Sequence, residues 1–165
     1  MLAWSVEQDK YPVAIRVPNI ELISSNNKDK TNYSTLNKYQ TTKKGDTVAL
    51  LGLGNFYFKA VEIAKLLENI GINATIINPK FITGIDCELM EELKQNHKVI
   101  VTLEDGELNG GFGEKIARYF GNSNLKVLNY GSHKEFSDRV SLDELYTKYR
   151  LKNELILEDI KNCLN

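Results

Sequence analysis

The stretch 98–119, KVIVTLEDGELNGGFGEKIARY, constrains the fold more than any other part of the sequence. It begins with a run of β-branched and apolar residues that is long enough for one buried strand. Two carboxylates, a glycine-rich loop and an amphipathic segment follow in that order. A buried strand, a glycine loop at its carboxyl end and a helix form one half of a βαβ unit. Ligands and partners of open α/β sheets gather at that edge, so this loop is the first candidate site.

The same alternation of strand and helix continues on both sides of this stretch. Further strands are expected at 47–51, 74–77 and 125–129, and helices at 56–69, after the capping residue Asp86, from Ser141 through Tyr149, and from the capping residue Asn153. A weaker edge strand is expected at 36–42, where a plain loop is the alternative. Strands that alternate with helices predict an α/β fold, with a mostly parallel sheet covered on both faces.

The first 35 residues have a different character. Leu2 to Val6 resemble the end of an apolar helix, and residues 13–17 form an apolar strand that Pro18 ends. Residues 23–34 are polar and rich in turn formers, as in a linker. We therefore expect residues 1–22 to be the end of an upstream domain, 23–35 a linker, and 36–165 the main domain.

Charge and composition exclude several classes of partner. The formal net charge of −1 offers neither a basic footprint for nucleic acid nor an acidic tail. No apolar run approaches the roughly 20 residues that a membrane span needs. Cys87 and Cys163 are far apart and lie in no ligand-spaced cluster, so two free thiols in a reducing cytoplasm are expected.

Most polar candidates in the main domain have a structural explanation. Gly52-Leu53-Gly54 lacks the third glycine and the acidic residue of a dinucleotide-binding motif, which favours a tight strand-to-helix turn.

Glu104 and Asp105 have no His or Cys close in sequence, so a structural or interface role, shared with Gly110 and Gly111, is favoured over catalysis. His97 is expected at a helix end and His133 in a loop, and neither is assigned to catalysis.

Arg16 differs from these residues because it lies within an apolar strand pattern. An arginine there is costly to bury unless it is paired or faces a cleft. Its planar guanidinium suits a phosphate or a carboxylate. A salt bridge to a neighbouring domain is an equally good explanation from composition alone.

Four blocks resemble the C-terminal region of the 1-deoxy-D-xylulose-5-phosphate synthase family, thiamine-dependent relatives of transketolase. They are PVAIRVPN (12–19), GDTVALLGLGNFYFKAVEIAKLL (45–67), the run 74–86, and VTLEDGELNGGFGEKI (101–116). The first block is the most specific to the synthases, whereas the last also occurs in other transketolase relatives. Val17, Asn19 and the run 83–85 depart from the family pattern, which indicates a divergent branch.

The resemblance implies a fold and a set of partners. The family's third domain is similar to a three-layer α/β/α sandwich whose five-stranded sheet has one antiparallel strand, here 36–42. Residues 1–22 would then be the end of the pyrimidine-binding domain, and the upstream domains of the same polypeptide would be the partners. The intact family enzyme is usually a homodimer, and we expect it in the cytoplasm.

The resemblance also implies a chemistry. The family condenses pyruvate, after decarboxylation, with glyceraldehyde 3-phosphate, using thiamine diphosphate and a divalent metal such as Mg²⁺ held between the first two domains. The residues that hold this cofactor and metal lie in the upstream domains. This chain is therefore expected to contain no catalytic, cofactor-binding or metal-binding residue and to be inactive alone. By the same resemblance, Arg16 matches the arginine that contacts the acceptor's phosphate. A transketolase, a 2-oxoacid dehydrogenase β subunit and a stand-alone binding module are the alternatives.

Overall fold

The computed structural model describes residues 1–17 and 31–165. It divides the chain into two compact units, Met1–Leu36 and Asn37–Asn165. The second unit contains the sheet and all of the buried apolar side chains among the described residues. Each unit is described by itself below.

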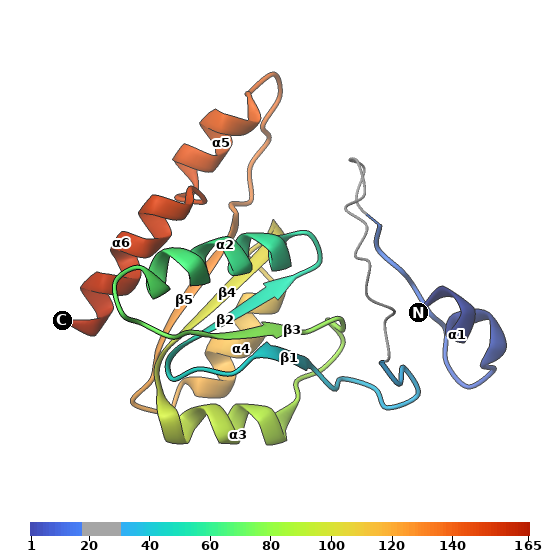
Figure 1. Ribbon diagram of the computed structural model, residues 1–165. Coiled ribbons are helices and arrows are strands. Elements are labelled where there is room, and N and C mark those ends of the chain that lie inside the picture. The colour runs from blue at the N-terminus through green and yellow to red at the C-terminus, as the bar shows by residue number, and fades with distance from the viewer. Residues whose placement is uncertain (18–30) are drawn as a thin grey trace. The chain divides into compact units, whose positions relative to one another are not determined.

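A five-stranded sheet forms the centre of the second unit (Figure 1). Its strands are β1 (Gln40–Lys43), β2 (Thr47–Leu53), β3 (Thr75–Asn78), β4 (His97–Glu107) and β5 (Lys126–Ser132), in the spatial order β1-β3-β2-β4-β5. β1 runs antiparallel to β3, and all other neighbouring pairs are parallel. The predicted mostly parallel sheet with one antiparallel strand is therefore confirmed, and the antiparallel strand is the short one at the edge.

Helices cover both faces of this sheet. They are α2 (Phe56–Glu68), α3 (Cys87–Asn96), α4 (Phe112–Phe120), α5 (Leu142–Lys148) and α6 (Asn153–Leu164). Alternate residues of β2 point to opposite faces, so Val48 and Leu50 pack with α2 and α6, whereas Ala49 and Leu51 pack with α3 and α4. Two separate apolar clusters result, one on each side of the sheet. This is the expected three-layer α/β/α sandwich.

Several element boundaries differ from the sequence-based expectation: the edge strand expected at 36–42 is β1 (Gln40–Lys43), β5 continues to Ser132, and two further differences involve residues discussed above. β4 continues to Glu107, so the carboxylates and Gly106 belong to the strand, because pairing resumes between Glu107 and Ser132 after an irregularity in register. Asn153 is the first residue of α6 and not its cap, since Lys152 occupies that position. The Asn153 side chain instead bonds to two side chains of α2: it accepts from Lys59 Nζ (3.0 Å) and donates to a Glu62 carboxylate oxygen (2.8 Å).

Among residues 1–17 and 31–36 of the first unit, the structure has one short helix, α1 (Leu2–Glu7), none of whose residues is buried. The strand expected at 13–17 is wrong in this structure, because residues 12–17 have no regular secondary structure. A strand exists only where it pairs, and no described strand pairs with this segment. Pro18, Asn19 and most of the expected linker lie outside the described residues. The division into residues 1–22, 23–35 and 36–165 stays a prediction.

The described residues contain no helix that is both long and apolar enough to cross a bilayer.

Candidate functional site

Glu104 lies at the carboxyl end of β4, where the sequence predicted a site. Its side chain is buried, with only 5% of its surface exposed. The two carboxylate oxygens accept hydrogen bonds from the backbone N–H groups of Phe112 (2.9 Å) and Gly113 (2.8 Å), the first two residues of α4. These groups have no partner within the helix, and the positive end of the helix dipole favours a negative charge there. Glu104 therefore joins the start of α4 to the central strand.

The glycines of the loop allow this close approach. A Cβ atom on Gly111 would lie 2.4 Å from the Glu107 carbonyl oxygen and 2.7 Å from one Glu104 carboxylate oxygen. A Cβ atom on Gly113 would lie 2.6 Å from Thr102 Oγ1, whose hydroxyl donates to Asn129 Oδ1 (2.8 Å). Gly110 has a φ of +73°, which L side chains rarely adopt. The glycine motif thus packs α4 against β4 and β5.

The two neighbouring carboxylates do not form an acid–base pair. Asp105 is exposed, whereas Glu104 is buried, and the pairing of β4 with β5 is irregular between Leu103 and Glu107. Asp105 and Gly110 remain at the exposed surface of this edge. The interface role assigned to Glu104, Asp105, Gly110 and Gly111 stays a prediction. Thr102 and Asn129 were not singled out, although a threonine within an otherwise apolar strand signals a buried polar contact.

The turn between β2 and α2 is structural, as the sequence favoured. A Cβ atom on Gly52 would lie 2.5 Å from Tyr57 Cα and 2.6 Å from the Phe56 carbonyl oxygen, so the helix closes directly over the strand end. Gly54 has a φ of +59°. This turn therefore leaves no space over Gly52 for a dinucleotide phosphate.

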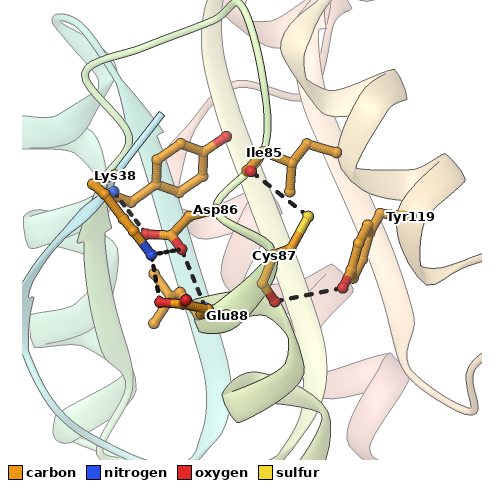
Figure 2. A network of polar contacts seen from close by, with 8 residues as sticks. Lys38, Ile85, Asp86, Cys87, Glu88 and Tyr119 are labelled. Carbon is orange, nitrogen blue, oxygen red and sulfur yellow. Dashed lines mark hydrogen bonds and ion pairs between the residues drawn. The ribbon is translucent and has the colours of Figure 1, made fainter. Parts of the chain in front are cut away.

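A second polar cluster surrounds Asp86 (Figure 2). Asp86 is the N-cap of α3, and its buried carboxylate accepts from the backbone N–H groups of Leu89 (3.4 Å) and Tyr39 (3.0 Å). Lys38 Nζ lies 3.1 Å from the same carboxylate and 2.5 Å from that of Glu88. The bonds from Lys38 and Tyr39 join α3 to the segment that leads into β1. The predicted capping role of Asp86 is confirmed, and three donors of the protein already bind its carboxylate.

Cys87 and Tyr119 lie beside this cluster (Figure 2). Cys87 is an exposed free thiol whose Sγ donates weakly to the Ile85 carbonyl oxygen (3.8 Å). The Tyr119 hydroxyl donates to the carboxylate of Glu91, and this hydrogen bond raises the pKa of Tyr119 to about 12. Among residues 1–17 and 31–165, no group of three or more His, Cys, Asp or Glu side chains is placed to hold a metal ion.

Residues 37–156 match the family model described as "Transketolase, C-terminal domain". The chain belongs to this family. The resemblance to the synthases is confirmed by curated relatives of that name. The 1-deoxy-D-xylulose-5-phosphate synthase of Clostridium tetani is 32% identical over 99% of this chain and 26% of its own length. That of Alkaliphilus oremlandii is 36% identical over 91% of this chain and 24% of its own length. The transketolase C-terminal domain described here thus spans about a quarter of these relatives.

Solved structures agree with this assignment. A structure titled "Split gene transketolase, inactive beta4 tetramer" superposes with a TM-score of 0.69 at 27% identity, over 78% of this chain and 42% of that one. A transketolase of Pichia stipitis superposes with a TM-score of 0.53 at 16% identity, over 77% of this chain and 18% of that one, which shows the fold alone.

Both histidines of this transketolase C-terminal domain lie where the sequence placed them. His133 follows β5 in a loop, with its ring 5.1 Å from that of Tyr149. His97 is the C-cap of α3: its Nδ1–H donates to the Leu93 carbonyl oxygen (3.2 Å), so Nε2 accepts from the Thr75 hydroxyl (2.8 Å). Burial lowers the pKa of His97, although the charges of Asp46 and Glu92 oppose this effect.

His97 should make the domain less stable as the pH falls through its titration range. The pKa of His97 is lower in the folded than in the unfolded chain, so the unfolded chain takes up the proton first. The contribution of the neutral ring to the free energy of unfolding is therefore fully present above about pH 6.5, the ordinary pKa of histidine. This contribution is lost as the pH falls through the pKa of the folded chain. The urea midpoint of the wild type should fall between pH 7 and pH 5 more steeply than that of His97→Gln. Parallel pH profiles would contradict this prediction.

Arg16 belongs to the first unit, where its side chain is exposed. Glu104 and the Asp86 cluster belong to the second unit. The assignment of Arg16 to the acceptor's phosphate therefore stays a prediction that depends on the proposed function.

Proposed function

We propose that this chain is the C-terminal domain of a 1-deoxy-D-xylulose-5-phosphate synthase-like transferase, which condenses pyruvate with glyceraldehyde 3-phosphate. One observation carries the proposal. The domain model matches only residues 37–156, whereas the similarity to the Clostridium tetani synthase extends over 99% of the chain. The similarity therefore includes residues before the shared domain, where the block 12–19 stands.

Within this proposal, Arg16 binds the phosphate of the acceptor. A guanidinium presents donors in a planar fork, which matches the oxygens of a phosphate better than a single ammonium does. The upstream domains of the same polypeptide would supply the rest of the site. A homodimer in the cytoplasm is part of the same proposal.

The proposed enzyme uses thiamine diphosphate and Mg²⁺, and the described residues do not fit either group. They contain no cluster of three potential metal ligands, and the Gly52–Gly54 turn is closed by α2. We therefore assign none of the described residues to the cofactor. When bound, the cofactor carries the two-carbon unit left by decarboxylation of pyruvate. In the proposed enzyme its binding residues belong to the upstream domains.

The 165-residue chain alone should not bind thiamine diphosphate. Titration calorimetry with the cofactor and MgCl₂ should give no heat beyond that of dilution. Saturable binding in the micromolar range would contradict this prediction and would place the cofactor site in this domain.

A transketolase is the second candidate, favoured by the superposition on the split-gene transketolase with a TM-score of 0.69. In that case the donor would be a ketose phosphate in place of pyruvate. The two candidate reactions differ in their products, since only the synthase reaction releases CO₂.

The whole gene product, assayed with thiamine diphosphate and Mg²⁺, separates the two candidates. With pyruvate and glyceraldehyde 3-phosphate, a synthase should release one CO₂ for each 1-deoxy-D-xylulose 5-phosphate formed. Two-carbon transfer from xylulose 5-phosphate without CO₂ release would support the transketolase and overturn the first proposal.

A further inference from the structure

A projecting segment, residues 133–142, links β5 to α5 and carries large apolar side chains in solvent. Phe136 is fully exposed, Leu142 is 65% exposed and Val140 is 41% exposed. Figure 1 shows this connection and α5 extending beyond the ends of β4 and α2. Single exposed apolar residues are common on protein surfaces, but three within seven positions of one projection form a candidate contact surface.

Side-chain contacts fix both ends of the projecting segment. Glu135, directly before Phe136, is bound by Lys148 Nζ (2.7 Å) and by the Tyr149 hydroxyl (2.5 Å). At the other end, Ser141 and Glu144 form a reciprocal capping box that starts α5. A surface ordered before binding loses less entropy when it docks, so this arrangement suits recognition.

The inner side of α5 already has a partner. Leu145 and Tyr146 pack against the apolar cluster on the α2 side of the sheet, and the Tyr146 ring lies 6.2 Å from that of Phe56. The exposed side chains of the projecting segment are therefore not the side by which α5 attaches to its own domain. They are free to contact another part of the protein.

We propose that the projecting segment docks on the upstream part of the same polypeptide, an inference that rests on the proposed function. The chain spans about a quarter of its curated relatives, and the family it matches is a C-terminal domain. About three quarters of such an enzyme therefore precedes this domain. The projecting segment leaves the sheet at the carboxyl end of β5, the edge at which partners of parallel sheets gather. Phe136 and Leu142 are its anchors.

Hydrogen exchange tests this inference in the whole gene product and in the 165-residue chain. Backbone amides of residues 134–142 should exchange at least tenfold more slowly in the whole protein. The double variant Phe136→Ser/Leu142→Ser should return them to the rates of the 165-residue chain. Its control is Ile70→Ser, which changes a side chain of 43% exposure at the turn after α2 and should leave the protection intact. Both variants should leave the thermal midpoint of the 165-residue chain unchanged, because the altered side chains are exposed.

Two outcomes would overturn the inference. The first is equal exchange in the two proteins. The second is slow exchange of residues 134–142 in the 165-residue chain at concentrations where light scattering detects its dimer, since the occupant would then be a second copy of this chain. Synthase activity is a separate readout: an active protein with an unprotected segment refutes the docking alone. A protected segment in a protein that forms no product refutes the proposed function and leaves the docking in place.

Discussion

Glu104→Ala should lower the free energy of unfolding by about 2–4 kcal/mol, since hydrogen bonds to charged groups contribute about 1.5–3 kcal/mol each and are not additive. The substitution removes the acceptor of two backbone N–H groups at the start of α4. Phe112 and Gly113 are buried, so after the substitution only water that enters the vacated space can accept from their N–H groups, and it carries no charge. Urea denaturation of the 165-residue chain measures the loss, provided that the slope is unchanged.

Two further variants identify the cause of that loss. Glu104→Gln keeps the size of the side chain, but its amide group can accept only one of the two N–H bonds, so an intermediate loss is expected. Asp105→Ala removes an exposed carboxylate from the next position of the same strand and should change stability by no more than about 0.5 kcal/mol. The structural role of Glu104 is refuted if its alanine variant is as stable as that of Asp105.

Arg16→Ala in the whole enzyme should lower kcat/KM for glyceraldehyde 3-phosphate roughly ten- to a hundredfold. A charge-assisted contact of about 1.5–3 kcal/mol corresponds to that range. Affinity for thiamine diphosphate and decarboxylation of pyruvate without acceptor should change little, because neither involves the acceptor's phosphate. Steady-state kinetics with both substrates varied separates these effects.

Arg16→Lys is the matched variant, because it keeps the charge and loses the planar fork. It should recover only part of the activity toward the acceptor. If Arg16→Ala keeps kcat/KM within about threefold, well under the 1.36 kcal/mol of a tenfold change, the arginine has a structural role. The proposal would then lose the residue that most directly links this chain to a phosphorylated acceptor.

The order and type of the elements in the main domain could be predicted because their signals are local. Asp86 and Ser141 cap the helices that follow them, and the apolar run 99–101 is buried as expected. The glycine turn at Gly52 was also predictable, since a dinucleotide motif needs residues that are absent from the sequence.

The errors concern features that depend on distant partners. The segment 13–17 has strand-forming residues but no described strand beside it, so composition alone was misleading. Asn153 has the chemistry of a cap, yet two side chains of α2 engage it. Glu104 and Asp105 are adjacent in the sequence, so the sequence could not show which of the two carboxylates is buried. That depends on how β4 is placed against the start of α4. None of these contacts lies within a few residues in the chain.

The position of β2 has a consequence for synthesis on the ribosome. β2 pairs with β3 on one side and with β4 on the other, and β4 follows β3 and α3 in the chain. One edge of this apolar strand therefore stays unpaired until translation has passed Glu107, and long-range parallel pairing is slow to form. During that interval the nascent chain exposes an unpaired strand edge of the kind that chaperones protect from aggregation.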